Sequence, residues 1–365
     1  MFFQQHRVPV QSCLLSASAA TASGIPDGNI ELIACNQCGL VFNRAFDPQT
    51  QEFSPHYEET QGFSPAFQRF SESLVADLDK RWNLLGQTVI EIGCGKGEFL
   101  DLLCARTGCR GLGIDPAFDP ERKPQLAAER VDFEQRLFSS DDIGRLQADY
   151  LICRHTLEHI GPVNEFLKTI QQACLAGGIT EVFIEIPESQ RIFAEGAFWD
   201  IYYEHANYFT APALAQAMEL AGFEVNDMQY LFHDQYLAVH ARPAASARSQ
   251  ETTAVVPESG KLHDTLALWR GRLERMNAPV VIWGSGSKGV SFLSHIGETD
   301  HIAAAIDINP FRHGRYMPGS ATPIMSPEAL IDVDPAHVIV MNPAYLEEIS
   351  TQIEALGLSP EIMAL

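Results

Sequence analysis

The sequence has few basic residues and no long hydrophobic run. Its 365 residues include 25 lysines and arginines against 47 aspartates and glutamates, a formal net charge of −22. This negative charge repels a phosphate backbone, so we expect no nucleic-acid partner. No apolar stretch approaches the ~20 residues of a membrane span, and Met1–His6 lacks the regions of a signal peptide. We therefore expect a cytoplasmic protein that does not bind membranes.

Cysteine is sparse as well. The eight cysteines are scattered along the chain, unlike the framework of a disulfide-rich secreted domain, so free thiols are expected. Only Cys35 and Cys38 have the spacing of metal ligands, in the form of half a zinc ribbon. A complete site needs two more ligands, for which Cys13 and, with weaker support, His6 are the candidates. Two alternatives stay open: a structural zinc ion on Cys13, Cys35 and Cys38, or free thiols in a tight turn.

The length and the pattern of the chain predict more than one α/β domain, since hydrophobic cores usually stop growing near ~300 residues. In the first unit, strands are expected at 88–92, 111–114, 150–153, 182–186, 223–230 and 235–241, and helices at 63–85, 163–174 and 212–221. This alternation is typical of a doubly wound, Rossmann-like parallel sheet. A second such unit has a helix at 261–276 and strands at 280–283, 303–306 and 338–341.

We divide the chain into three parts on this basis. Residues 1–60 form a small amino-terminal lobe, residues 61–243 the first Rossmann-like domain, and residues 244–365 a second Rossmann-like domain. Residues 242–251 are poor in large apolar side chains and are predicted to be a linker.

A glycine-rich turn follows the first strand of the larger domain. It reads Glu91-Ile92-Gly93-Cys94-Gly95-Lys96-Gly97, and glycines at alternate positions allow positive φ angles and close approach of a ligand. About 20 residues further on, Asp115 ends the next strand, where a carboxylate can accept hydrogen bonds from a ribose diol. The turn lacks the Gly-x-Gly-x-x-Gly spacing that clears a pyrophosphate. A tight turn without a ligand is the alternative.

This turn resembles the first motif of class I S-adenosylmethionine-dependent methyltransferases. The resemblance implies a cofactor site for S-adenosylmethionine made of Gly93, Cys94, Gly95, Asp115, Phe138, Ser139 and His155. In that family the turn lines the methionine, the acidic residue binds the ribose, and the residues after the third strand lie near the adenine. The segment after the fourth strand, residues 153–160 here, passes beneath the methionine.

A segment rich in aromatic and ionisable side chains precedes the helix at 212–221. Residues 198–210 contain six aromatic rings together with Glu204 and His205. Such a segment can simply be core. The alternative is chemical, because removing a proton from a carbon beside a ketone requires a base that titrates near neutral pH, such as an imidazole. His205 fits that role, and Glu204 either orients it or binds a hydroxyl or amine of the substrate, since neighbouring side chains of an extended chain point to opposite faces.

The order of these features is similar, over nearly the whole chain, to that of the sugar C-methyltransferases of deoxysugar biosynthesis. The shared features are a cysteine-bearing lobe, the cofactor domain, a Tyr-x-Glu-His-x-x-Tyr-Phe segment and a second Rossmann-like domain. The resemblance implies that a nucleotide-linked ketosugar is surrounded by Tyr57, His159, Tyr202, Glu204 and His205. It further implies that His205 forms an enolate, and that the carbon next to the ketone receives the methyl group.

Two positions depart from that family. Tyr203 stands where the family commonly has a histidine, and Asp234-Gln235-Tyr236 replaces its Gly-Gly-Ser. We expect the bulkier side chains at the second position to reshape the acceptor pocket.

Three functions remain open from the sequence. The leading hypothesis is C-methylation of the ketosugar, and the second is N- or O-methylation of another small molecule at the same donor site. The third is a binding protein with a vestigial cofactor pocket. The carboxy-terminal domain contains a glycine-rich helix start at Gly284–Gly289 that includes Lys288. Two alternatives stay open: this helix start binds an anionic group, or the domain is a scaffold that only forms one side of the active site.

Overall fold

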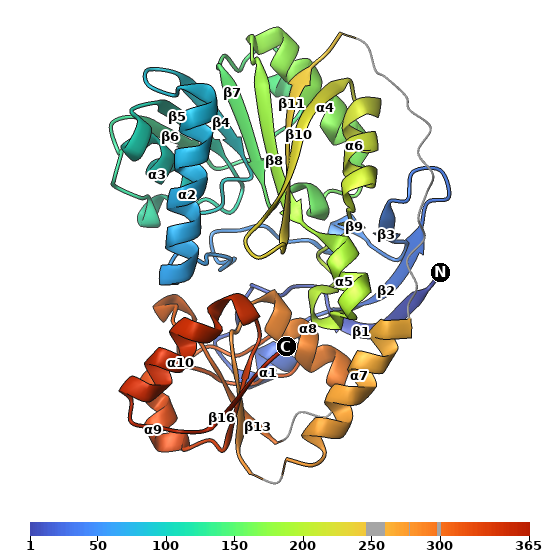
Figure 1. Cartoon of the computed structure of the whole chain (residues 1–365), viewed down its shortest axis with the longest axis vertical. Coiled ribbons are helices and arrows are strands. Elements are labelled where there is room, and N and C mark those ends of the chain that lie inside the picture. Colours follow the sequence, from blue (N-terminus) through green and yellow to red (C-terminus); the bar gives the residue numbers. More distant parts are fainter. Residues whose placement is uncertain (246–259, 277, 298–300) are drawn as a thin grey trace.

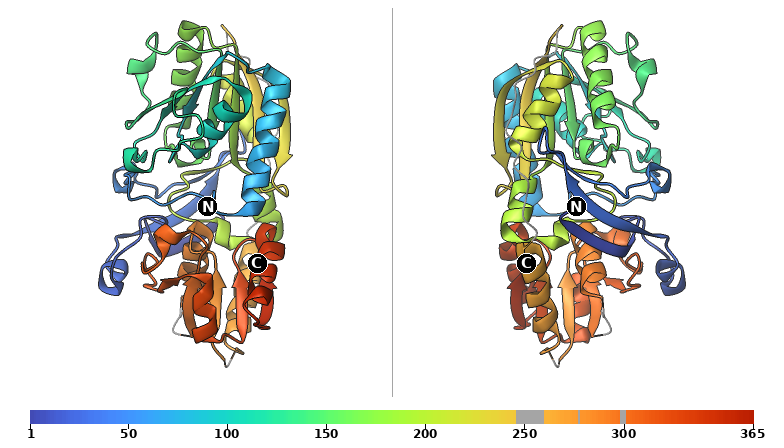
Figure 2. Two further views of the ribbon diagram at one scale, coloured as in Figure 1. Left: turned by 90° about the vertical axis from the view of Figure 1, so that its left-hand side faces the viewer. Right: turned by 90° about the vertical axis from the view of Figure 1, so that its right-hand side faces the viewer.

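Three β-sheets are stacked along the long axis of the molecule. The computed structural model describes residues 1–245, 260–276, 278–297 and 301–365. The seven-stranded sheet lies at one end, the five-stranded sheet at the other, and the small amino-terminal sheet lies between them at one side (Figures 1 and 2). In the described parts of the chain, no helix combines the length and the hydropathy that a membrane crossing requires.

The largest sheet has the strand order β10-β11-β8-β7-β4-β5-β6. Its strands are β4 (Thr88–Ile92), β5 (Arg110–Ile114), β6 (Val131–Glu134), β7 (Tyr150–Arg154), β8 (Glu181–Pro187), β10 (Phe223–Leu231) and β11 (Tyr236–Pro243). Strands β4 to β8 pair in parallel, whereas β11 pairs antiparallel with both β8 and β10. The prediction of a doubly wound parallel sheet is therefore confirmed.

Helices cover both faces of this sheet, which explains why its central strands are apolar on both sides. On one face, Leu78 of α2 (Pro65–Trp82) and Leu100 of α3 (Glu98–Thr107) pack against Val89. On the other face, α4 (Val163–Gly177) and α6 (Ala211–Leu220) bury Leu167 and Leu214. This double cover fixes the carboxyl ends of β4, β5 and β7, from which the cofactor motifs extend.

The second parallel sheet has the order β14-β13-β12-β15-β16. It consists of β12 (Val280–Trp283), β13 (Ile302–Ile306), β14 (Ile324–Met325), β15 (His337–Val340) and β16 (Glu361–Ala364). Its helices are α7 (Gly260–Leu273), α8 (Ser287–Ile296), α9 (Leu330–Val333) and α10 (Leu346–Ala355). This is the second Rossmann-like unit that the sequence predicted. Of the predicted linker, residues 242 and 243 end β11, and residues 246–251 lie outside the described residues.

The amino-terminal lobe contains a sheet that we did not predict, with the order β1-β2-β3-β9. Its strands are β1 (Phe3–Pro9), β2 (Asp27–Ala34), β3 (Val41–Asn43) and β9 (Asn207–Tyr208), and the short helices α1 (Ala19–Ser23) and α5 (Ser189–Glu195) lie in the segments that precede β2 and β9. Strand β9 pairs with β3 through Val41 and Tyr208, although the two residues are far apart in sequence. The lobe is therefore bonded directly to the segment that contains His205.

Candidate functional site

A cavity of about 1030 Å³ lies where the carboxyl ends of the two parallel sheets face the amino-terminal lobe. Its walls come from the segments after β4, β5 and β7, from the lobe around Tyr57, and from the segments after β12, β13 and β15. Ligands of open α/β sheets bind at such carboxyl ends. Pockets for single small ligands measure roughly 300–1,000 Å³, so this cavity has room for a cofactor and a second molecule.

The glycine turn after β4 forms one wall of the cavity. The φ angles of Gly93, Gly95 and Gly97 are 73°, 54° and 83°, in the left-handed region that favours glycine. A Cβ atom at Gly93 would lie 1.8 Å from the Oγ1 atom of Thr156. A side chain at Gly93 would collide with that of Thr156, so glycine lets the turn lie close to the segment after β7.

Asp115 closes this turn from the end of β5. Its Oδ2 atom accepts a hydrogen bond from the Gly95 amide at 2.8 Å, and its Oδ1 atom accepts one from the Ala117 amide at 2.6 Å. Burial raises the pKa of Asp115, and the two amide hydrogen bonds oppose that shift. A carboxylate offers about four acceptor positions, so two remain for a diol.

The structure brings most of the predicted cofactor residues to this cavity. The wall includes Gly93, Cys94, Gly95, Asp115, Phe138 and His155. Phe138 packs edge-on against Phe166 with ring centroids 5.9 Å apart, which forms an apolar surface for a flat ring. Ser139 is not among the residues that line the cavity, and its hydroxyl caps a short helix by accepting a hydrogen bond from the Asp141 amide, so its place in the cofactor site stays a prediction.

The predicted acceptor residues lie across the cavity from the glycine turn. Tyr57, His159, Tyr202 and His205 line it together. The rings of Tyr202 and His205 have centroids 4.0 Å apart, and those of His159 and His205 are 5.0 Å apart. The segment from Tyr202 to His205 thus supplies a hydroxyl and an imidazole at one place.

Glu204 is the exception, because its side chain points away from the cavity into the amino-terminal lobe. Its Oε2 atom accepts the Ser12 amide at 3.0 Å, and the Tyr57 hydroxyl interacts with the same carboxylate. Burial raises the pKa of Glu204 to about 7, while these contacts oppose the shift. Glu204 and His205 thus point to opposite faces, as expected for neighbouring side chains, and Glu204 is not among the residues that line the cavity. Glu204 instead holds Tyr57.

The backbone of Glu204 orients His159. The Nδ1 atom of His159 lies 2.9 Å from the Glu204 carbonyl oxygen, and because a carbonyl only accepts, Nδ1 carries the hydrogen. Its Nε2 atom therefore carries the lone pair. Burial lowers the pKa of His159 to about 4, and burial together with the nearby His159 charge lowers the pKa of His205 well below its usual value. Two neutral imidazoles thus face the cavity, and the pKa of His205 lies below the near-neutral value that we expected of the base.

A charged cluster that the sequence revealed only in part lies beside these imidazoles. Asp200 accepts a hydrogen bond from Arg191 at 2.7 Å and forms an ion pair with Lys288, at the start of α8. Burial opposes ionisation of Asp200, but Lys288 and Arg191 together lower its pKa. All three residues line the cavity. Arg191 also forms an ion pair with Glu195 at 2.9 Å, so two cations and two carboxylates balance in this cluster.

The two departures from the family pattern at 235 and 236 lie on the cavity wall. Gln235 donates a hydrogen bond from Nε2 to Oδ1 of Asn342 at 2.9 Å, which joins the two parallel sheets. The Tyr236 ring packs edge-on against His155 with centroids 4.5 Å apart. These side chains therefore shape the cavity, as we expected from their size.

The three cysteines that we considered as zinc ligands do not lie together in the structure. Cys13 lies beside the cavity, 3.6 Å from the Ser287 hydroxyl, and burial raises the pKa of its thiol to about 11. Cys35 and Cys38 lie in the turn between β2 and β3, and no third potential ligand accompanies them among the described residues. A structural zinc ion requires four ligands, so this pair does not fit one.

Removal of metal is therefore expected to leave the stability of the protein unchanged. We predict that EDTA shifts the melting temperature by less than about 2 °C, because a structural zinc ion would contribute directly to folding free energy. Differential scanning calorimetry before and after chelation measures this. A fall of more than about 5 °C in EDTA that zinc reverses, and that the Cys35→Ser/Cys38→Ser variant does not show, would establish a structural zinc at this pair.

Comparison with known proteins relates both parallel sheets to methyltransferases. Residues 60–227 match the family described as methyltransferase domain, and residues 261–358 match the C-methyltransferase C-terminal domain. C-methyltransferase NovU of Streptomyces niveus is 24% identical over 350 residues, which cover 88% of this chain and 81% of that protein. A ubiquinone biosynthesis O-methyltransferase of Aeromonas salmonicida is 25% identical over 221 residues, 55% of this chain and 85% of its own.

The solved structures that this chain matches include 1,6-didemethyltoxoflavin-N1-methyltransferase of Burkholderia thailandensis. It has a TM-score of 0.36 and 21% identity, and the match covers 49% of this chain and 79% of that chain.

Proposed function

Since this chain is an S-adenosylmethionine-dependent methyltransferase, we propose that it is a C-methyltransferase and methylates the carbon beside the ketone of a nucleotide-linked sugar. The observation that carries the proposal is the pair of neutral imidazoles, those of His159 and His205, on the wall of the cavity that also contains the glycine turn. A carbon acceptor must lose a proton, and a neutral imidazole offers the lone pair that removes it.

The cofactor supplies an electrophilic methyl group when it is bound. Gly93 and Gly95, which carry no side chain, would let its methionine part approach the turn closely, and Asp115 would hold the ribose diol. Phe138 offers an apolar face for the adenine. The chain's own contribution is to place that donor across the cavity from the acceptor residues.

In the proposed reaction, His205 removes the proton from the carbon next to the ketone. Burial raises the pKa values of Tyr57 and Tyr202 well above the usual value, so both hydroxyls stay protonated. Tyr202 can donate to the enolate oxygen, whereas the Tyr57 hydroxyl donates to Glu204 and its oxygen can accept a hydrogen bond from the acceptor. Glu204 holds Tyr57 in place for this task. His159, with its lone pair on Nε2, accepts a hydrogen bond from a sugar hydroxyl or acts as the rival base.

The charged cluster of Arg191, Asp200 and Lys288 supports an anionic group on the acceptor. It lies at the start of α8, where backbone amides and the helix dipole favour negative charge. The Nε atom of Arg191 has no hydrogen-bond partner among the residues that the structure describes. A diphosphate that links a sugar to a nucleoside would fill this position.

We expect Arg191→Gln to raise the KM for the acceptor by about tenfold, since a hydrogen bond to a charged group contributes ~1.5–3 kcal/mol. Donor affinity should stay unchanged, because the glycine turn lies on another wall. Steady-state kinetics measure the first value and calorimetry the second. Arg44→Gln, at an exposed arginine of the lobe, is the control. An unchanged KM in Arg191→Gln would remove this cluster from the acceptor site.

The acceptor class is tested with S-adenosylmethionine that carries a ¹³C-methyl group and a panel of thymidine- and guanosine-linked ketosugars. We expect one of them to give a product whose labelled methyl resonance is that of a methyl group bonded to carbon. Resonances of O-methyl or N-methyl groups only, with these or other small molecules, would support the alternative reaction.

A further inference from the structure

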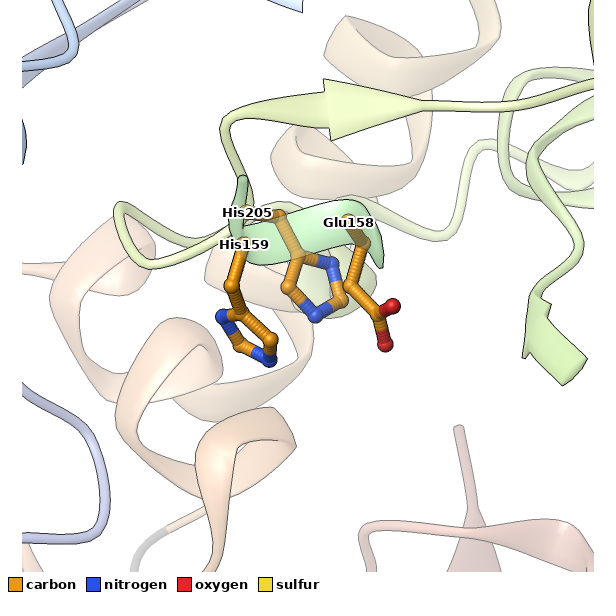
Figure 3. A group of neighbouring side chains, drawn as sticks. All are labelled: Glu158, His159 and His205. Atoms are coloured by element: carbon orange, nitrogen blue, oxygen red, sulfur yellow. The ribbon is translucent and has the colours of Figure 1, made fainter. Parts of the chain in front are cut away.

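We propose that Glu158, His159 and His205 form a binding site for one divalent transition-metal ion. Each offers a ligand atom, and these atoms all lie within 4.8 Å of one another. The three side chains project in the same direction, and all three line the cavity (Figure 3). Two of them were identified above for other tasks, whereas Glu158 has no task in the proposed reaction.

Glu158 is the group that points to a cation. Its side chain is buried, with 2% of the residue exposed, and its Oε2 atom has no hydrogen-bond partner among the described residues. The nearest basic group is the Nδ1 atom of His155, 3.9 Å from Oε1. A buried carboxylate without partners is costly unless it is protonated, paired with a charge or bound to a metal. A metal ion between Glu158 and the two imidazoles would satisfy it.

His159 is held in the way that metal-binding histidines are held. Its Nδ1–H group donates to the Glu204 carbonyl oxygen at 2.9 Å, which fixes the ring and leaves the lone pair on Nε2. Metal-ligating histidines almost always donate their other N–H group to a carbonyl, a carboxylate or water. The ring is therefore oriented before an ion arrives.

The ligand types select the class of ion. Imidazole nitrogen suits Zn²⁺, Co²⁺ and Ni²⁺, whereas Mg²⁺ and Ca²⁺ prefer oxygen ligands only. Two imidazoles and one carboxylate leave coordination positions open toward the cavity, where water or an oxygen of the acceptor can bind.

His205 cannot bind a metal ion and act as the catalytic base at the same time. This conclusion rests on the proposed function. The lone pair of His205 cannot hold an ion and remove a proton at the same time. We therefore expect an ion bound here to inhibit methyl transfer. Binding itself is measured without donor or acceptor, so it succeeds or fails independently of the proposed reaction.

The test is a calorimetric titration of the full chain with Co²⁺ after treatment with EDTA and dialysis. It is done in the Cys35→Ser/Cys38→Ser background, which removes the only cysteine pair with ligand spacing. We expect one Co²⁺ per chain, with a visible spectrum free of thiolate charge-transfer bands. Glu158→Gln and His159→Gln should each weaken binding at least about tenfold.

Two controls keep this test specific. Glu165→Gln alters an exposed carboxylate on α4, and His240→Asn alters a buried histidine outside the cavity, so neither should change the affinity for Co²⁺. Donor affinity and circular dichroism verify that each variant is folded. Failure of Co²⁺ to bind, or equal binding in folded Glu158→Gln and His159→Gln, overturns the site.

A second measurement tests the inhibition. With a working acceptor, saturating Co²⁺ should lower methyl transfer by the Cys35→Ser/Cys38→Ser variant at least about tenfold, and EDTA should restore it. Full activity with one Co²⁺ bound per chain, or a rate that Co²⁺ increases, would overturn the claim that the ion occupies His205.

Discussion

Replacing His205 by asparagine should lower the rate of methyl transfer by about 10²–10⁴-fold, the usual contribution of a general base. Asparagine keeps much of the side-chain volume and one hydrogen-bonding group, but it cannot take the proton. Donor affinity should barely change, because the donor motifs lie in the segments after β4 and β5, whereas His205 lies directly before β9. Single-turnover measurements give the rate, and calorimetry with S-adenosylhomocysteine gives the affinity.

Two matched variants complete this prediction. His240→Asn places asparagine at another buried histidine, on β11 and away from the cavity, and should keep near-normal turnover. His159→Asn tests the rival base. If His205→Asn retains turnover while His159→Asn abolishes it, the roles assigned to the two imidazoles are reversed.

The second large effect concerns the donor site. Asp115→Ala should weaken the affinity for S-adenosylmethionine by roughly tenfold to a hundredfold, because a hydrogen bond to a charged group contributes ~1.5–3 kcal/mol. The carboxylate also holds the Gly95 and Ala117 amides, so its loss loosens the turn that receives the cofactor. Calorimetry with the folded variant measures the change.

Asp132→Ala is the control for that variant. Asp132 is exposed on β6 and does not line the cavity, so its loss should leave donor affinity unchanged. Equal affinities of folded Asp115→Ala and the wild type would remove Asp115 from the donor site.

The parallel sheets were predictable because their strands are buried on both faces. Short runs that consist mostly of apolar residues, such as Val89–Ile92 and Val280–Trp283, can be recognised as strands without knowing which strands they pair with. The structure places β4 and β12 there. The sheet of the amino-terminal lobe was not predictable in the same way. Strand β9 has only two residues, and its pairing with β3 depends on a contact between distant parts of the chain.

In the site, too, features with a local sequence pattern were predictable, whereas contacts between distant segments were not. The glycine turn, Asp115 and the segment from Tyr202 to His205 carry local patterns, and the structure brings them to one cavity. The pairing of Arg191 and Lys288 through Asp200 has no local pattern, because α8 is far from α5 in sequence.

Sequence spacing does not give the surroundings of a side chain, as Cys13 and Glu204 illustrate. Cys13 was grouped with Cys35 and Cys38 as a ligand, but it lies next to Ser287 at the cavity. Glu204 was expected at the substrate, but its carboxylate turns toward Ser12. Glu158 was overlooked, although its position directly before His159 was a signal that could have identified it.

The central claim is that this enzyme forms an enolate from its acceptor before the methyl group is transferred. Proton NMR in heavy water tests it directly, with an accepted ketosugar, the wild-type enzyme and S-adenosylhomocysteine in place of the donor. We predict that the signal of the hydrogen on the carbon beside the ketone disappears with the wild type, and disappears about 10²–10⁴-fold more slowly with His205→Asn. Retention of that signal by the wild type, while the labelled methyl group of S-adenosylmethionine is transferred to an oxygen or nitrogen of the same acceptor, would contradict the account.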